Sequence, residues 1–357
     1  MILEIIGAIA AGYQVFAIVA CLRFRRSAAS WKRGSALPVS ILKPVSGLDA
    51  GFHEAIASHC KLEGEYELLC GVRSPDDPAL AVLRNFPQVR VIECVTDAPN
   101  QKAGVMMELA RQARYPLMIV NDADIRVEPD YLARVTAPLA DPGAGLVTCL
   151  YRAHGETFAA RFEGLGVATE FAPSTLVARM VGVEEFAMGS TLAFRRADLE
   201  KIGGFAAIAD YLADDYQLGA KLHALGLRCV LSDVIVDTHL SGGWGDVWRH
   251  QVRWARTIRV SKFGGYLGLP VTFATLWAVV AACGGRWSIA LAVLAARMLM
   301  ALESGWMVMR SRDVLRLWFL IPLRDLFGAA VWAVALFGNS VIWRGQRLRL
   351  RRDGRIE

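Results

Sequence analysis

Apolar residues crowd the two ends of this 357-residue chain, and this distribution limits its possible folds more than any other feature. Residues 2–22 are apolar apart from Glu4 and Gln14, a length that suits one helical crossing of a bilayer. A secretory signal would carry positive charge before its apolar run, whereas here the basic residues follow it: Arg23, Arg25, Arg26, Lys32 and Arg33. Because basic residues mark the cytoplasmic side of a membrane helix, we expect an N-terminal anchor over residues 1–22 and a cytoplasmic chain beyond it.

The C-terminal third holds three further apolar runs. Residues 267–283 and 287–309 predict a helical hairpin that turns at Gly284-Gly285, and the arginines after it return the chain to the cytoplasmic side. The run 326–343 creates a conflict, because a full crossing would leave the arginine-rich tail 344–357 outside. We therefore favour a re-entrant or interface-lying segment there, or a different pairing of the spans, and the number of spans stays open at three or four.

Charge and cysteine content narrow the class of protein. The net charge is +6, and much of it lies beside the apolar runs, where it indicates membrane-flanking residues rather than nucleic-acid binding. The seven cysteines are scattered and form no CxxC pair. This argues against a zinc site and a disulfide framework and fits a reducing compartment.

The middle of the chain alternates between strand-like and helical patterns. Short apolar runs rich in β-branched residues occur at 39–45, 66–72, 89–95, 117–122, 145–150, 190–194 and 229–236. Helical patterns occur between several of them, at 52–61 and 104–114. Strands separated by helices predict an α/β domain with a mostly parallel sheet covered on both faces.

Acidic residues follow two of these strands. Asp76 and Asp77 come after the strand at 66–72, and Asp122 and Asp124 follow the apolar residues that end at Val120. Ligands of such sheets bind beyond the carboxyl ends of the strands. Two carboxylates one residue apart can face one cation, and hard oxygen ligands suit Mg²⁺ or Mn²⁺. The alternative is that Asp122 caps a turn and Asp124 is solvated.

Two more segments carry candidate chemistry. Asp214 and Asp215 open a predicted helix, where aspartate serves as a cap or, beside a cleft, as a general base. Residues 244–262 form a second helical pattern, with Trp244 and Trp248 on one side and arginines on another. This helix is predicted to lie in the membrane interface, or else to pack on a core.

Five motifs, read in order, resemble the ceramide glucosyltransferase family: ILKPVSGLD (41–49), SPDDPA (74–79), NDADIRV (121–127), LADDY (212–216) and HQVRW (250–254). The resemblance implies an inverting GT-A glycosyltransferase of the broad family 2 group, which moves glucose from a UDP-sugar to ceramide. LVTCLYR (146–152) and HQVRWARTIR (250–259) further resemble the bacterial branch associated with hopanoid lipids, which implies transfer of N-acetylglucosamine to bacteriohopanetetrol as the alternative. The implied location is the bacterial inner membrane.

The resemblance also assigns roles to residues of the donor site. Asp77 matches the acid near the uridine, and Asp122 matches the acid of the metal and diphosphate, which Asp124 completes to D-x-D. Lys102 falls where the family places a lysine near the donor. Asp215 matches the base that deprotonates the acceptor hydroxyl. The neighbouring acids Asp76 and Asp214 could exchange roles with Asp77 and Asp215.

The resemblance places a last motif near both the diphosphate and the acceptor. Arg253 and Trp254 match the Arg-Trp end of the Q/R-x-x-R-W motif, which the family places near both. Its first position holds His250 instead of Gln or Arg. This departure leaves two possibilities open, that His250 donates to a phosphate or that Gln251 substitutes from a shifted register.

These inferences divide the chain into an anchor (1–22), a cytoplasmic GT-A domain (36–243), an interfacial helix (244–265), a membrane region (266–343) and a basic tail (344–357). Two other functions stay open. A processive polysaccharide synthase usually needs a longer membrane region. A non-catalytic membrane binding protein would require all of these acids to be structural.

Overall fold

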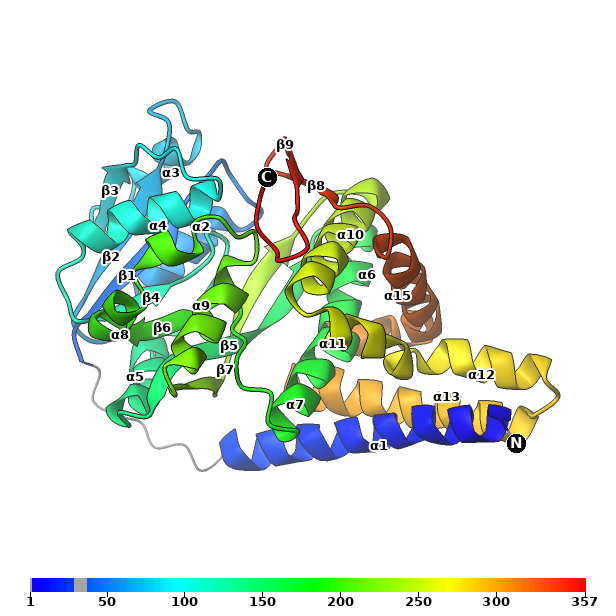
Figure 1. Cartoon of the computed structure of the whole chain (residues 1–357). Helices are drawn as coiled ribbons and strands as arrows, with labels where there is room; N and C mark the ends of the chain where they lie inside the picture. The colour runs from blue at the N-terminus through cyan, green and yellow to red at the C-terminus, as the bar shows by residue number, and fades with distance from the viewer. Residues whose placement is uncertain (1, 29–36) are drawn as a thin grey trace. The chain divides into compact units, whose positions relative to one another are not determined.

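The computed structural model describes residues 2–28 and 37–357 (Figure 1). Lys32, Arg33 and the expected first residue of the domain, at 36, therefore lie outside the described residues. The chain divides into two compact units. A helical unit is formed by Met1–Ser27, Arg152–Gly182 and Leu240–Gly354, and a sheet unit by Ala28–Tyr151, Val183–His239 and Arg355–Glu357. The expected domain boundaries stay a prediction, although segment Arg152–Gly182 groups with the helical unit.

Seven strands form the sheet, in the order β3-β2-β1-β4-β6-β5-β7. β1 pairs in parallel with β2 and β4, and β2 pairs in parallel with β3, whereas β6 runs antiparallel to β4 and β5. The strands are β1 Val39–Pro44, β2 Tyr66–Val72, β3 Val89–Glu93, β4 Leu117–Val120, β5 Ala144–Gly155, β6 Leu192–Arg195 and β7 Arg228–Leu240. The predicted α/β class with a mostly parallel sheet is confirmed.

Helices cover both faces of this sheet. They are α2 Phe52–His59, α3 Ala79–Leu83, α4 Gln101–Gln112, α5 Tyr131–Thr136, α8 Arg196–Lys201 and α9 Asp214–Ala224, with single turns at Ala137–Ala140 and Phe205–Ile208. Successive strand residues point to opposite faces. Ile41 of β1 accordingly packs in one core with Ile56 and Leu132, and the next residue, Leu42, packs in another with Met106. Burying each of these side chains stabilises the fold by roughly 1.5–3 kcal/mol.

The helical unit contains long apolar helices and a short hairpin. Its helices are α1 Ile2–Ala28, α6 Phe158–Gly166, α7 Ala172–Met180, α10 Trp244–Ser261, α11 Phe263–Gly268, α12 Ala274–Cys283, α13 Trp287–Leu302, α14 Arg312–Arg316 and α15 Ile321–Ala335. Shorter turns are η2 Val167–Phe171, η4 Leu269–Thr272, η5 Glu303–Val308 and η6 Trp318–Leu320. Strands β8 Ser340–Trp343 and β9 Gln346–Arg349 pair antiparallel.

Within the described residues, three helical segments are long and apolar enough to cross a membrane: Glu4–Ser27, Trp287–Val308 and Trp318–Ala335. A fourth candidate is the pair Phe263–Thr272 and Ala274–Cys283, which is bent by 54°. The range of three to four agrees with the sequence analysis. The predicted turn between α12 and α13 also forms, with Gly285 in the left-handed region at φ 73°.

The last apolar segment differs from its prediction. Residues 326–343 are not one element, because the helix ends before Gly338, which adopts φ 76°, and Ser340–Trp343 forms strand β8. Glycine followed by asparagine favours a turn over a continued helix. Whether the helical part of this run crosses the membrane, re-enters it or lies in its interface stays a prediction.

Two of the membrane-length helices run side by side in the same direction (Figure 1). An ion pair of 3.3 Å joins Glu4 on α1 to Arg286 before α13, and one of 2.8 Å joins Arg25 to Glu303 at the other end. Within this unit, the basic residues in the last turn of α1, Arg25 and Arg26, therefore lie at the same end as the segment that follows η5.

Candidate active site

Four parallel strands, β1 to β4, bring their carboxyl ends to one edge of the sheet unit, and candidate acids follow two of them. Asp77 comes after β2, and both of its carboxylate oxygens accept hydrogen bonds from the N–H of Gly47, after β1, at 3.1 and 3.0 Å. Asp77 Oδ1 also accepts from the N–H of Ala79 at 2.9 Å. Asp77 thus ties two loops of this edge together, whereas its neighbour Asp76 is exposed.

A lysine lies among the carboxylates of this edge. The Nζ atom of Lys102, on α4, lies 2.7 Å from Asp122 Oδ1 and 3.1 Å from Asp214 Oδ2. Burial acts to lower the pKa of Lys102, but the neighbouring carboxylates, Asp215 included, outweigh burial and leave the pKa well above its usual value. The amino group is therefore charged at neutral pH and partly balances the acids around it.

Asp215 is held in the first turn of α9. Its Oδ2 accepts from the N–H of Gly189 at 2.9 Å, and its Oδ1 accepts from the N–H of Tyr216 at 2.7 Å. Burial and the charge of Asp214 raise the pKa of Asp215 to about 6, against the opposing effect of Lys102. A carboxylate with this pKa is ionised at pH 7 and is still basic enough to accept a proton from a hydroxyl.

The D-x-D segment is anchored from two strands. Asp124 accepts a hydrogen bond from the hydroxyl of Thr238 on β7, and burial together with the charge of Asp122 raises the pKa of Asp124 to about 6. The fully buried Lys43 of β1 donates to the carbonyl oxygens of Asp122, at 3.0 Å, and Ile125, at 3.5 Å. Burial lowers the pKa of Lys43 to about 8. Asp124 is therefore held in place, unlike the solvated acid of the alternative interpretation.

The predicted metal ligands, Asp122 and Asp124, supply the oxygen atoms that Mg²⁺ or Mn²⁺ prefers. Across the described residues, no three or more His, Cys, Asp or Glu side chains gather in a way that could hold a metal ion. Two carboxylates still fit a nucleotide-bound cation, because Mg²⁺ takes one or two carboxylates and completes its shell with water and substrate phosphates. A cation would also relieve the repulsion that helps to raise the pKa of Asp124. The metal assignment stays a prediction.

In the helical unit, the residues predicted at 250–254 lie on α10. The Nδ1 atom of His250 lies 2.7 Å from Oε1 of Glu163, and Gln251 Nε2 donates to the same oxygen at 2.8 Å. Glu163, on α6, is only 2% exposed. Gln251 Oε1 accepts from Arg324 Nη2 at 2.8 Å. His250 and Gln251 therefore share one buried carboxylate that attaches α10 to α6, and Gln251 also joins α10 to α15.

Aromatic contacts extend the packing of α10. The ring of Trp254 lies tilted against Phe171 at 6.4 Å, and Trp248 packs edge-on against Phe327 of α15 at 5.5 Å. Arg253 is half-buried on the same helix. These contacts are those of a helix packed on a core, the alternative that the sequence left open. A position in the membrane interface stays a prediction.

The family model of Glycosyl transferase family 21 matches residues 2–356, nearly the whole chain. The chain belongs to glycosyltransferase family 21. Among curated proteins, this family 21 chain is 28% identical to ceramide glucosyltransferase 1 of Caenorhabditis elegans over 204 residues, which are 54% of this chain and 44% of that protein. Ceramide glucosyltransferase 3 of the same organism is 31% identical over 212 residues, 56% of this chain and 46% of that protein. Each match thus spans less than half of the relative.

The resemblance to ceramide glucosyltransferases is thereby confirmed. The motifs had indicated the broad family 2 group, whereas the matching family model is that of family 21. Among solved structures, the family 21 chain is similar to the mannosyltransferase PcManGT from Pyrobaculum calidifontis in complex with GDP-Man and Mn²⁺. The TM-score is 0.52 at 18% identity, over 92% of this chain and 99% of that one. At this identity the likeness shows a shared fold, which confirms the predicted GT-A-like fold.

Several residues of the site had no assigned role in the sequence analysis of this family 21 chain. Gly189 donates to Asp215, and a Cβ atom there would lie 2.8 Å from Asp122 Oδ2, so the site needs glycine at this position. Lys43 belongs to the motif ILKPVSGLD, but nothing in that motif predicts that its amino group binds the carbonyl oxygens of the D-x-D segment. Glu163 follows Phe162 and precedes the apolar residues 164–168, and an acid beside such residues suggests a buried carboxylate.

Proposed function

We propose that this chain is an inverting membrane glycosyltransferase that moves a hexose from a UDP-sugar to the hydroxyl of a membrane lipid, with glucose and ceramide as the pair to test first. The observation that carries the proposal is the group formed by Lys102, Asp122, Asp214 and Asp215 at the sheet edge. It combines a charged donor for phosphate oxygens with a carboxylate of pKa about 6. Family membership and the ceramide glucosyltransferase relatives support the substrate class.

Asp215 acts as the general base in this proposal. Its carboxylate takes the proton of the acceptor hydroxyl while the hydroxyl oxygen bonds to the anomeric carbon. The bond from that carbon to the diphosphate oxygen breaks, and its electron pair leaves with UDP. A single displacement of this kind inverts the configuration of the anomeric carbon. The two N–H groups on Asp215 hold its carboxylate in position and favour its ionised form.

The leaving diphosphate carries negative charge that the site must stabilise. Lys102 supplies a fixed positive charge beside Asp122. When bound, a Mn²⁺ or Mg²⁺ ion held by Asp122 and Asp124 neutralises the diphosphate. Asp77, which orders the loops after β1 and β2, is proposed to face the uridine. The motif residues His250, Gln251, Arg253 and Trp254 are proposed to serve the diphosphate and the acceptor, on the basis of their match to the family motif alone.

We further propose that the protein spans a bacterial inner membrane with its catalytic domain in the cytoplasm. The parallel run of α1 and α13 supports this orientation, because the basic residues in the last turn of α1 and those after η5 then lie on one side. A UDP-sugar is a soluble metabolite and the acceptor is a lipid, so a membrane-attached enzyme gives each substrate access. The motifs at 146–152 and 250–259 favour the second candidate pair, N-acetylglucosamine and bacteriohopanetetrol.

The test uses purified full-length protein in phosphatidylcholine vesicles with Mn²⁺. Labelled UDP-glucose and UDP-N-acetylglucosamine are each offered with ceramide or bacteriohopanetetrol. We expect label from UDP-glucose in ceramide, its loss in Asp215→Asn and with EDTA, and its retention in the exposed control Asp76→Asn. Label from UDP-N-acetylglucosamine in the hopanoid would replace the substrate pair. Absence of transfer with every pair by the folded protein would contradict the proposal.

A further inference from the structure

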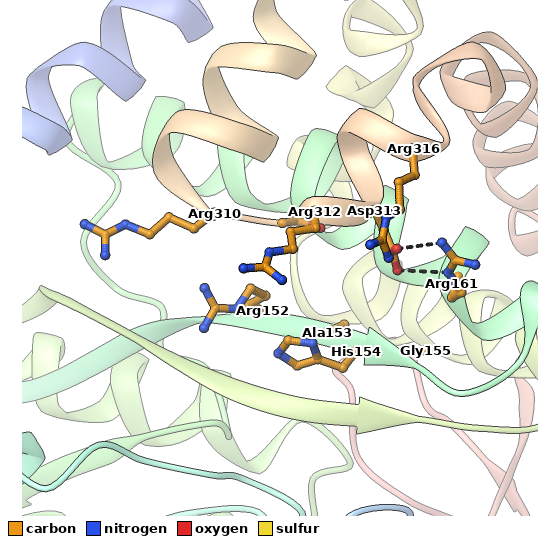
Figure 2. Close-up of a pocket in the computed structure, with 10 residues that line it drawn as sticks. Arg152, Ala153, His154, Gly155, Arg161, Arg310, Arg312, Asp313 and Arg316 are labelled. Carbon is orange, nitrogen blue, oxygen red and sulfur yellow. Dashed lines mark hydrogen bonds and ion pairs between the residues drawn. The ribbon is translucent and has the colours of Figure 1, made fainter.

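A hollow rich in arginine lies within the helical unit, on elements that carry none of the proposed catalytic residues (Figure 2). Its volume is about 550 Å³. The residues that line it, here named the arginine hollow, are Arg152, Ala153, His154, Gly155, Arg161, Arg310, Ser311, Arg312, Asp313 and Arg316. They come from the end of β5, from α6, and from the segment that joins η5 to η6.

The charges of the arginine hollow are not balanced. Asp313 is the one acid among the ten lining residues, and it is matched to Arg161, whose Nε and Nη2 donate to its two oxygens at 3.1 and 2.7 Å. The exposed side chains of Arg310, Arg312 and Arg316 make no hydrogen bond or ion pair with another part of the chain that the structure describes. The hollow therefore holds excess positive charge that suits an anion.

Two of the arginines are placed in a way that suits phosphate. In Figure 2 the side chain of Arg312 reaches toward that of Arg152, whereas the side chain of Arg310 extends away from both. Arg152 Nη1 donates to the carbonyl oxygen of Met309 at 3.3 Å, which fixes one nitrogen of its planar group. A guanidinium presents several N–H donors in one plane and binds phosphate oxygens in pairs.

The backbone of Arg310 has an unusual conformation. Arg310 adopts φ 52° two residues after the end of η5, and its N–H donates to the carbonyl oxygen of Trp306 at 3.1 Å. Glycine is the usual residue at such a helix end, because other side chains are strained in the left-handed region. An arginine at this position therefore adds backbone strain that a glycine would avoid, as it does at Arg344 in the turn between β8 and β9.

The position of the hollow in the chain indicates which anion. Its arginines at 310, 312 and 316 lie between the membrane-length segments Trp287–Val308 and Trp318–Ala335. A short connection that directly follows a span lies at the depth of the lipid headgroups, whether the next segment crosses the membrane or lies in its interface. Large apolar side chains are exposed on both sides of it, Trp306 and Met307 before and Trp318 and Phe319 after. Aromatic residues of this kind belong to the membrane interface.

We propose that the arginine hollow binds the phosphate group of an anionic phospholipid, with the acyl chains along the neighbouring apolar side chains. This rests on the part of the proposed function that sets the helical unit in a membrane, and not on the transfer reaction. Basic residues beside membrane spans bind anionic headgroups in this way, each strengthening the attraction several-fold. The arginine hollow shares no residue with the donor site of the sheet unit.

The test measures binding to the full-length protein in a non-ionic detergent, with dioctanoyl phosphatidylglycerol, dioctanoyl phosphatidylcholine and inorganic phosphate as separate probes. The test variant is Arg310→Gly with Arg312→Gln. Glycine at 310 suits the backbone, so the variant is expected to fold. The matched control is Arg344→Gly, which makes the same change at φ 48° in the turn between β8 and β9, outside the hollow.

We expect phosphatidylglycerol to bind at least tenfold more tightly than phosphatidylcholine, and to lose about tenfold in affinity in the test variant but not in the control. Equal binding of the two lipids, or equal loss in the control, would overturn the proposal. Binding of inorganic phosphate as tight as that of phosphatidylglycerol would overturn the lipid assignment. Sugar transfer is measured on the same samples, so a failed transfer reaction is told apart from a failed lipid site.

Discussion

Replacement of Asp215 by asparagine separates catalysis from folding, because the structure predicts a large effect on one and a small effect on the other. In the folded protein, burial and Asp214 raise the pKa of Asp215 from 3.8 to about 6. The stabilising contribution of this group is therefore present below pH 3.8 and is lost as the pH rises through 6. At pH 8 the ionised carboxylate destabilises the fold by up to about 3 kcal/mol, which asparagine removes.

The substitution by asparagine also removes one hydrogen-bond acceptor. Both oxygens of Asp215 accept N–H hydrogen bonds, from Gly189 and Tyr216, and an amide offers only one oxygen. Leaving one N–H unpaired costs about 1–3 kcal/mol. The two effects oppose each other, so we expect the free energy of unfolding to change by no more than about 1 kcal/mol and the thermal midpoint by no more than about 4 °C.

The rate of sugar transfer should change far more than the stability does in Asp215→Asn. Loss of a general base lowers the rate by about 10²–10⁴-fold. The assay is the initial rate of labelled sugar transfer in vesicles from pH 5 to 8, beside thermal unfolding of the same samples. In the native protein, kcat should fall as the pH drops below about 6, where Asp215 gains a proton. More than a tenth of native activity in Asp215→Asn would show that Asp215 is not the general base, and a thermal midpoint lowered by 10 °C or more would show that its role is structural.

Three further substitutions test the surroundings of the site and the helical unit. Lys102→Met leaves three carboxylates without their cation, so KM for the UDP-sugar should rise at least tenfold in steady-state kinetics, and an unchanged KM would contradict its donor role. Gly189→Ala places a Cβ atom 2.8 Å from Asp122 Oδ2 and 3.3 Å from the lysine Nζ, so kcat should fall about tenfold with little change in thermal midpoint, and native kcat would show that the contact is relieved. Asp325→Asn leaves the fully buried Arg297 without its carboxylate, so thermal unfolding in detergent should show a loss of about 3–5 kcal/mol, and an unchanged midpoint would mean that the pair is not structural.

The strands could be predicted because buried parallel strands have a strong apolar signature. The predicted strand at 66–72 coincides with β2. The predicted strand at 39–45 is one residue longer than β1. β5 and β7 are longer than predicted, at 12 and 13 residues, because polar residues such as Arg152 and Thr238 continue the strand where the apolar pattern stops. An apolar pattern shows how far a core extends but not how far backbone pairing extends beyond it.

The candidate acids were visible for a similar reason, since each stands just after a strand or at the start of a helix. Their partners were not visible. Lys43 lies 79 residues from Asp122, and Thr238 lies 114 residues from Asp124. Such contacts depend on which strands become neighbours, and a single sequence does not encode that order locally. The same holds for Glu163, which joins His250 and Gln251 across nearly ninety residues.

The configuration of the product decides whether Asp215 assists a single displacement, because that reaction allows one outcome. The donor UDP-sugar is α-linked, so the glycolipid formed by the purified protein should be β-linked, as shown by the coupling constant of its anomeric proton. We expect a β-linked product that is lost in Asp215→Asn. An α-linked product would require a double displacement or another mechanism, and would contradict the role assigned to Asp215.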